Sequence, residues 1–299
     1  MIRKNIRIGM VFLCFSFITA LVQAQDFQKA YRLAEGNKVG IKNVAGDILV
    51  KGYDGGEILV TAFKEGRDRD RLTIEDFSSE TSVDVRVKYP QDCNCEASIR
   101  FEVQVPRALN YNYDGFSTVA GNIKIEEVMG MIRADNISGL ILLRNVSGTI
   151  YASSLSGDVT IEQATEIVPT PSSGQSSGRS NGGARRVERR YLRGDRPNNS
   201  VLAKSISGNV KVTLIQLASS NMNQMEFTSL SGNVEVRMPE NLGADVEMST
   251  VVGKVETNFA LTLVKSEIGI GGSARGRLGD GSRGLKITST SGNVALWKN

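Results

Sequence analysis

The middle of the chain repeats a nine-residue pattern of apolar and polar positions around a glycine. From Val119 to Gln163, five consecutive units read VAGNIKIEE, VMGMIRADN, ISGLILLRN, VSGTIYASS and LSGDVTIEQ. The first, fifth and seventh columns are apolar in every unit, and the alternation between the fifth and seventh predicts a short strand with one buried face. The glycine in the third column predicts a corner, because positive φ or close backbone contact leaves no room for a Cβ.

One such unit cannot bury its apolar face alone, so neighbouring units must stack. The chain is therefore expected to be all-β, a β-helix-like β-solenoid of short strands with glycine corners, in which successive strands lie about 4.8 Å apart. Each unit is expected to supply one strand and one corner. The glycines expected at corners are Gly46, Gly121, Gly130, Gly139, Gly148, Gly157, Gly208, Gly232, Gly253 and Gly292.

Looser copies of the repeat extend this pattern over most of the chain. They are VAGDILV at 44–50, ISGNVKV at 206–212, LSGNVEV at 230–236, VVGKVET at 251–257 and TSGNVAL at 290–296. Residues 25–118 are expected to form an irregular β region that caps the N-terminal end, before the strict repeat at 119–163. Residues 201–299 are expected to complete the solenoid, either with longer coils or with a second sheet facing the first, and the last strand, near Trp297, is expected to close it.

The chain opens with the layout of a secretory signal peptide. Basic residues precede an apolar run at 8–22, which is shorter than the roughly 20 residues that span a bilayer, and Ala24 suits a cleavage site. Residues 1–24 are therefore predicted to be a signal peptide, and no transmembrane segment is expected after cleavage. The protein is expected to be exported to the periplasm, the outer surface or the extracellular space.

Charge offers little guidance except in one segment. The chain has 36 Lys and Arg against 32 Asp and Glu, and this near balance gives no overall field that would select nucleic acid. Residues 164–200 break the repeat with a Ser-, Gly- and Arg-rich stretch that is predicted to be a disordered basic insertion. It is a candidate contact for an anionic polymer, and the alternative is a solvated linker. The candidate contact residues are Arg185, Arg186, Arg189 and Arg190.

The chain contains no histidine, which excludes Ser-His-Asp and Cys-His catalysis and the usual His-ligated metal sites. The column after glycine holds Asn122, Met131 and Leu140 in succession, so oxygen ligands do not repeat as they do in calcium-binding nonapeptides. No catalytic residue, metal site or cofactor is therefore predicted. Paired carboxylates remain available for cleaving a polysaccharide, but no pair is singled out by its spacing.

Two cysteines remain after the leader, Cys93 and Cys95. They are expected to form a structural disulfide or to stay as inert thiols, because residues two apart on a strand face the same way and an exported protein meets oxidising conditions. The alternative is a redox or soft-metal pair. A site of four Cys and His ligands cannot be completed in a chain without histidine.

Apolar side chains are also expected on the outside of the middle coils. If the fifth and seventh columns face the core, then Met131, Leu140 and Leu142 point outward beside Tyr151. Such a strip is either covered by another part of the chain or offered to a partner.

The signal peptide, the repeated [VIL]-S-G-[ND]-[VI] units and the closing segment GIGGSARG…LKITSTSGNVAL together resemble the bacterial putative-adhesin family of SGxV β-strand-repeat proteins, a domain of unknown function. The resemblance covers roughly residues 35–299 and implies an envelope or surface protein. The function expected is therefore a non-catalytic, adhesin-like scaffold that binds an envelope polysaccharide or a surface protein. The alternatives are a carboxylate-dependent carbohydrate-active enzyme and a self-assembling structural element, and the oligomeric state is left open.

Overall fold

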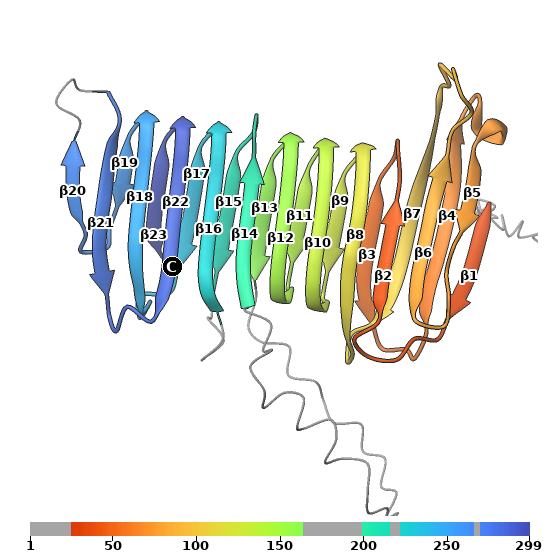
Figure 1. Ribbon diagram of the computed structural model, residues 1–299, viewed down its shortest axis with the longest axis horizontal. Helices are drawn as coiled ribbons and strands as arrows, with labels where there is room; N and C mark the ends of the chain where they lie inside the picture. Colours follow the sequence, from red (N-terminus) through yellow and green to blue (C-terminus); the bar gives the residue numbers. More distant parts are fainter. Residues whose placement is uncertain (1–24, 164–198, 216–221, 266–269) are drawn as a thin grey trace, which may run out of the picture.

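The computed structural model describes residues 25–163, 199–215, 222–265 and 270–299. These residues contain no α-helix and form 23 strands and one short 3-10 helix, η1 (Arg69–Arg71). The strands make two large mixed sheets that face each other along the length of the molecule (Figure 1). The expectation of an all-β fold is confirmed.

Sheet A is the shorter-stranded of the two in the repeat region and is parallel except at its N-terminal edge, where β1, β4 and β7 pair antiparallel. Its described strands in spatial order are β1 (Phe27–Tyr31), β4 (Ile58–Gly66), β7 (Ala97–Pro106), β3 (Ile48–Tyr53), β9 (Ile123–Glu126), β11 (Ile141–Arg144), β13 (Val159–Gln163), β15 (Val210–Leu214), β17 (Val234–Met238), β23 (Val294–Lys298) and β19 (Val255–Thr257).

Sheet B is parallel in its middle and antiparallel at both edges, where β20 and β18 pair with β21 and where β5 pairs with β6. Its described strands in spatial order are β20 (Thr262–Lys265), β21 (Gly272–Leu278), β18 (Ala244–Val252), β22 (Arg283–Ser291), β16 (Met222–Ser231), β14 (Asn199–Ser205), β12 (Ser147–Ser156), β10 (Met129–Ser138), β8 (Asn110–Ala120), β2 (Lys38–Lys42), β6 (Ser82–Lys88) and β5 (Thr73–Asp76).

Consecutive nine-residue units enter different sheets. β9, β11 and β13 are short strands of sheet A, whereas β10 and β12 are ten-residue strands of sheet B. Ile132 of β10 therefore pairs with Ile150 of β12, and Ile141 of β11 pairs with Ile123 of β9. Each unit does supply one strand, but two units are needed for each turn of the chain, and a second sheet faces the first throughout the strict repeat.

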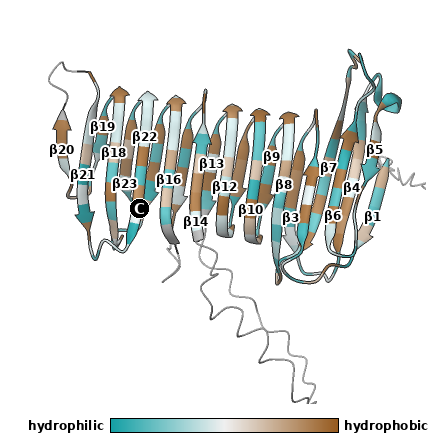
Figure 2. Ribbon diagram, viewed as in Figure 1, coloured by the Kyte–Doolittle hydropathy of each residue, from teal (hydrophilic) through white to brown (hydrophobic). Residues whose placement is uncertain are grey.

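The core lies between the two sheets and is filled by the fifth and seventh columns of the repeat. Because strands stack in register, each core side chain packs between its counterparts in the turns before and after it, and full burial of one aliphatic side chain contributes about 1.5–3 kcal/mol. The hydropathy pattern alternates along the strands accordingly (Figure 2). Core positions exposing 3% or less of their surface include Ile123, Ile125, Ile132, Ala134, Ile141, Leu143, Ile150 and Ala152.

Eight of the expected corner glycines form a line along the molecule, here called the glycine line. A Cβ on Gly139, where φ is +129°, would lie 2.2 Å from the carbonyl oxygen of Gly121 in the neighbouring turn. Gly157 lies outside the left-handed region, yet its Cβ would lie 2.0 Å from the oxygen of Gly139. Close stacking of turns is therefore the shared reason for glycine. In spatial order the line is Gly46, Gly121, Gly139, Gly157, Gly208, Gly232, Gly292 and Gly253.

The other two expected corner glycines, Gly130 and Gly148, lie at the opposite ends of the sheet B strands. Each is the second residue of its strand, β10 or β12, rather than a separate corner. A Cβ on Gly148 would lie 2.1 Å from the oxygen of Gly130, and one on Gly130 would lie 1.9 Å from the oxygen of Tyr111. In the strict repeat, glycine is thus needed both along the glycine line and at the start of the sheet B strands.

Buried polar side chains tie neighbouring turns together beside the glycine line. Asn136 Nδ2 donates to the carbonyl oxygen of Gly121 at 2.8 Å, and Ser205 Oγ donates to that of Gly157 at 2.8 Å. These bonds satisfy carbonyl groups that would otherwise be buried without a partner at the corner. The same place in successive turns is held by Asn43, Thr118, Asn136, Ser154, Ser205, Ser229, Ser289 and Thr250.

The Asn or Asp that follows the glycine makes a second set of bonds between turns. Asn209 Oδ1 accepts the backbone N–H of Asn233 at 3.0 Å, and Asn233 Oδ1 accepts that of Asn293 at 2.8 Å. Leu140 interrupts this set, because its own N–H donates to Asn122 Oδ1 at 2.9 Å but its side chain offers no acceptor to the next turn. The S-G-[ND] motif therefore encodes contacts between turns.

The last strands in the sequence are not the last in space. β22 lies between β16 and β18, and β23 lies between β17 and β19. The expectation that the strand near Trp297 closes the structure is therefore wrong, because parallel strands of one repeat pair equally well in either order along the chain. The end of the core is instead covered by Phe259, which is buried, and by Leu261.

The N-terminal region combines parallel turns with antiparallel edge strands. β2 and β3 pair in parallel with β6 and β7 on one side and with β8 and β9 on the other. The two outermost strands are linked across the sheets, since Asp76 of β5 accepts hydrogen bonds from Lys29 Nζ at 2.5 Å and from Tyr31 Oη at 3.0 Å, both on β1. This link closes the N-terminal end.

Candidate functional site

A depression lies on the outer face of sheet A, over β3, β7 and β9. Its volume is about 510 Å³, within the range of small-ligand sites, although it is open rather than enclosed. We call it the sheet A hollow. It is lined by Leu49, Val50, Lys51, Gly52, Tyr53, Asp54, Glu102, Val103, Gln104, Arg107, Lys124 and Glu126.

Strand register places the polar side chains of the hollow on one face. Lys51 pairs with Gln104 of β7 on one side and with Glu126 of β9 on the other. Lys51 and Gln104 lie between buried neighbours, and Glu126 follows the buried Ile125, so all three point away from the core. β3 lies between β7 and β9 in sheet A. This order places segments from three parts of the sequence side by side.

The end of the hollow is shaped by Gly52 and Arg107. A Cβ on Gly52 would lie 1.9 Å from the carbonyl oxygen of Glu127, so no side chain fills this place. Arg107 crosses it, with Nη2 donating to the carbonyl oxygen of Gly52 at 3.3 Å and with ion pairs to Asp54 at 3.0 Å and Glu127 at 3.1 Å. These contacts fix the guanidinium as part of the wall.

Most charges around the hollow are already paired. Lys124 Nζ lies 3.0 Å from Glu126 Oε1, and Arg144 Nη1 lies 3.4 Å from the same oxygen. Glu102 forms an ion pair with Arg100. Lys51 is exposed and makes no ion pair with any described residue. The hollow therefore presents one unpaired cation among amide, carboxylate and phenol groups that can exchange hydrogen bonds with a ligand.

Tyr53 supplies the aromatic surface of the hollow. Its hydroxyl donates to the carbonyl oxygen of Glu57 at 2.6 Å, which fixes the ring. Gly55 lies against the ring, since a Cβ there would come within 2.1 Å of it. A phenol ring held in place in this way gives the hollow an apolar surface with a polar edge.

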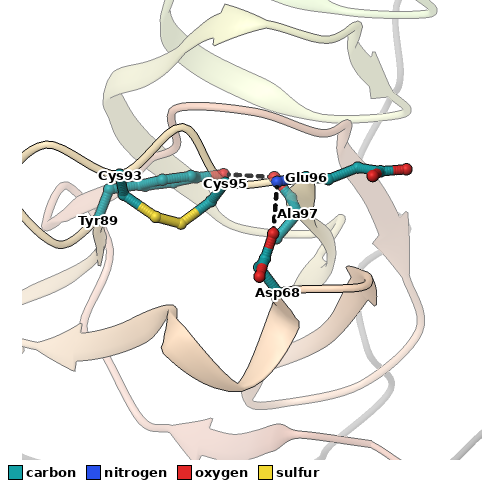
Figure 3. Close-up of a disulfide and its surroundings, with 6 residues drawn as sticks. All are labelled: Asp68, Tyr89, Cys93, Cys95, Glu96 and Ala97. Carbon is teal, nitrogen blue, oxygen red and sulfur yellow. Dashed lines mark hydrogen bonds between the residues drawn. A yellow bond between two sulfur atoms is a disulfide. The ribbon is translucent and has the colours of Figure 1, made fainter.

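The structure joins Cys93 to Cys95 as a disulfide, with the Cα atoms 5.0 Å apart (Figure 3). The bridge lies in the connection between β6 and β7, far from the hollow along β7. Tyr89 Oη donates to the carbonyl oxygen of Ala97 at 3.0 Å, and the N–H of Glu96 donates to Asp68 at 3.0 Å (Figure 3). The bridge thus sits in a loop that hydrogen bonds hold on either side.

The other expected surface features are distributed differently. Arg185, Arg186, Arg189 and Arg190 lie outside the described residues, as does the predicted signal peptide. Met131 and Tyr151 belong to sheet B, whereas Leu140 and Leu142 are on the sheet A side of the corner. The expected single strip of these four side chains is therefore not formed, because the three units that supply them alternate between the two sheets.

Sequence reasoning did not single out the sheet A hollow. Lys51 follows the copy VAGDILV at 44–50, but nothing in the letters shows that β7 will lie next to it. Among the described residues there is no cluster of three acidic or cysteine side chains that could hold a metal ion. No helix in the described part of the chain is long and apolar enough to cross a membrane.

No family model and no curated protein matches this chain. Among solved structures it is similar to a putative cell adhesion protein from Clostridium sporogenes ATCC 15579, at 9% identity over 91% of this chain and 99% of that one, with a TM-score of 0.36. A putative adhesin from Bacteroides fragilis NCTC 9343 matches at 12% identity over 91% and 96%, with a TM-score of 0.42. A putative lipid binding protein from Parabacteroides distasonis ATCC 8503 matches at 10% identity over 91% and 96%, with a TM-score of 0.32. At these TM-scores the similarity carries no inference about function.

Proposed function

We propose that this protein is a non-catalytic, exported and adhesin-like envelope protein, a β-solenoid in architecture, that binds an acidic envelope polysaccharide in the sheet A hollow. The unpaired ammonium group of Lys51 in that hollow is the observation that carries the proposal. The signal peptide predicted at 1–24 and the resemblance to the putative-adhesin family agree with it.

The chemistry of the hollow favours a polymer with anionic sugars. Lys124 and Arg107 are neutralised by carboxylates at 3.0 Å, so Lys51 is the cation left to attract a ligand's carboxylate or phosphate. Gln104 beside it supplies both donors and acceptors for hydroxyl groups. Because the hollow is open on the sheet face, a polysaccharide chain can enter at one side and leave at the other.

Calorimetric titration with oligogalacturonate and oligoalginate, and with neutral cellopentaose, tests this assignment. We expect an acidic oligosaccharide to bind and the double variant Lys51→Ala/Gln104→Ala to bind at least about tenfold more weakly, since loss of a hydrogen bond to a charged group costs about 1.5–3 kcal/mol. The matched control is Lys211→Ala, which removes an exposed lysine from β15 on the same sheet face.

Three results would contradict the proposal. The first is the absence of binding to every acidic oligosaccharide by folded protein. The second is equal weakening by the Lys211→Ala control. The third is the appearance of new reducing or unsaturated ends in the titration mixtures, which would instead support a carbohydrate-active enzyme.

A further inference from the structure

The first column of the repeat divides into buried and exposed residues. Val128 and Val146, which precede the strands of sheet B, are buried. Val119, Ile137 and Leu155, near the C-terminal ends of β8, β10 and β12, expose 43%, 46% and 46% of their surface. The difference arises because the chain turns outward between the buried polar position and the glycine line.

The exposed residues continue as a line over the whole stack, here called the aliphatic ridge. Parallel pairing of Ser138 with Ser156, of Ser205 with Ser229 and of Val252 with Ser291 keeps its members in register. In spatial order the ridge is Val44, Val119, Ile137, Leu155, Ile206, Leu230, Thr290 and Val251.

The ridge is long, narrow and apolar. Eight positions at strand spacing extend about 34 Å. All but Thr290 are aliphatic. Hydrophobic colour accordingly recurs at the upper tips of β8, β10, β12, β16 and β18 (Figure 2). Scattered apolar residues are ordinary on a surface, but a continuous apolar line of this length marks an interaction site.

The residues beside the ridge are mainly neutral. Serines follow it at Ser138, Ser156 and Ser207, and asparagines of the column after the glycine lie beyond them. An anionic lipid surface would need a basic flank, which the ridge does not have. Neutral polar flanks around an apolar centre are typical of contacts between proteins.

We propose that the aliphatic ridge is the interface of a two-fold symmetric dimer in which two copies of this chain pack ridge to ridge and antiparallel. Charge placement supports this occupant. Asp47 lies beside Val44 at one end of the ridge, and Lys254 lies beside Val251 at the other. An antiparallel two-fold places Asp47 of each copy next to Lys254 of the other, so this pair forms twice.

The remaining charges beside the ridge meet neutral residues in the same arrangement. Counting positions from the two ends, Lys42 faces Ser249, Asp135 faces Thr228, Asp158 faces Asn209 and Lys204 faces Ser153. No two like charges therefore oppose each other. The surface is self-complementary, as an isologous contact requires.

Sedimentation velocity tests the dimer. We expect the wild-type protein to shift from monomer to dimer with rising concentration and the variant Leu155→Asp/Ile206→Asp, at the centre of the contact, to remain a monomer. The matched control is Met131→Asp, which alters a side chain of 42% exposure on the outer face of sheet B and should leave the dimer intact. Circular dichroism melting curves establish that the variants are folded.

Two sedimentation results would overturn the proposal. One is a wild-type protein that stays monomeric at every concentration. If this monomer also floats with neutral phosphatidylcholine vesicles, the ridge contacts lipid and not a second copy of the chain. The other is a variant Leu155→Asp/Ile206→Asp that is folded and dimerises as the wild type does.

Cross-linking tests the antiparallel orientation. In this arrangement, the two copies of residue 155 lie about 5 Å apart along the ridge, whereas those of residue 119 lie about 24 Å apart. We therefore expect a short bismaleimide to join Leu155→Cys chains and to leave Val119→Cys chains separate. Equal cross-linking of both variants, or cross-linking of Val119→Cys alone, would overturn the antiparallel dimer.

Discussion

At the scale of single residues, the repeat is a set of contacts between turns rather than within them. The glycine allows close backbone approach. In most turns the Ser, Thr or Asn three residues before that glycine donates to a carbonyl of the neighbouring turn, and the Asn or Asp after the glycine accepts a backbone N–H of the neighbouring turn. Each letter of the motif thus has a partner about 4.8 Å away in space and far away in sequence.

Two buried serines in this set provide a matched comparison. Ser205 Oγ donates to the carbonyl oxygen of Gly157 at 2.8 Å, whereas Ser154 Oγ has no hydrogen-bond partner among the described residues. We expect Ser205→Ala to lower the free energy of unfolding by about 1–2 kcal/mol, because it leaves a carbonyl unpaired, and Ser154→Ala to change it by less than about 0.5 kcal/mol. Urea denaturation measures both. An equal loss in the two variants would show that the bond to the turn is not the source of stability.

The same scale shows what the sequence could and could not predict. Alternation identified Ile123 and Ile125 as core residues, because period two alone decides which face of a strand is buried. It could not separate buried Val128 from exposed Val119, which occupy the same column. Their difference depends on whether the residue precedes or follows a strand of sheet B, and that becomes known only when two units are seen to make one turn.

At the scale of elements, the ends of the stack are held by specific links between edge strands. Asp76 on β5 is the clearest, because it joins the edge of sheet B to β1 at the edge of sheet A. Burial works against its ionisation, but hydrogen bonds from Lys29, Ser78 and Tyr31 outweigh burial and lower the pKa of Asp76 from 3.8 to about 2. The folded state therefore stabilises the ionised form of the Asp76 carboxyl group.

This shift fixes the direction of a pH dependence. A carboxyl whose pKa is lower in the folded state stabilises the protein above its unfolded pKa, and that stabilisation is lost as the pH falls toward the folded value. We expect Asp76→Asn to be less stable than the wild type at pH 7, with the difference shrinking as the pH falls from about 4 to about 2. Thermal melts across this range measure it. The control is Asp70→Asn, a change at an exposed carboxylate; a pH-independent difference for Asp76→Asn would contradict the assignment.

The order of elements in space is where sequence reasoning failed most clearly. β22 and β23 fill a place between earlier turns, and β6 and β7 lie outside β2 and β3. Copies of one repeat have equivalent edges, so nothing local distinguishes the pairing that forms from its alternatives. The sheet A hollow depends on this order, because β7 meets β3 and β9 only through it, and for that reason the site was not predicted.

At the scale of the whole molecule, the two sheets and the corner between them separate three surfaces. The outer face of sheet A carries the hollow, the corner beside the glycine line carries the aliphatic ridge, and the core between the sheets is closed at both ends. A ligand in the hollow and a second copy on the ridge would therefore not compete. The stack keeps both surfaces rigid, because every described parallel strand is paired on both sides except at the ends.

Lysine footprinting tests ligand binding in the hollow most directly. The full chain is acetylated briefly with and without the acidic oligosaccharide that binds in calorimetry, and modification of each lysine is read by mass spectrometry. We expect the ligand to protect Lys51 and to leave Lys211, on the same sheet face, modified as before. Equal modification of Lys51 with and without saturating ligand would contradict the sheet A hollow as the binding site.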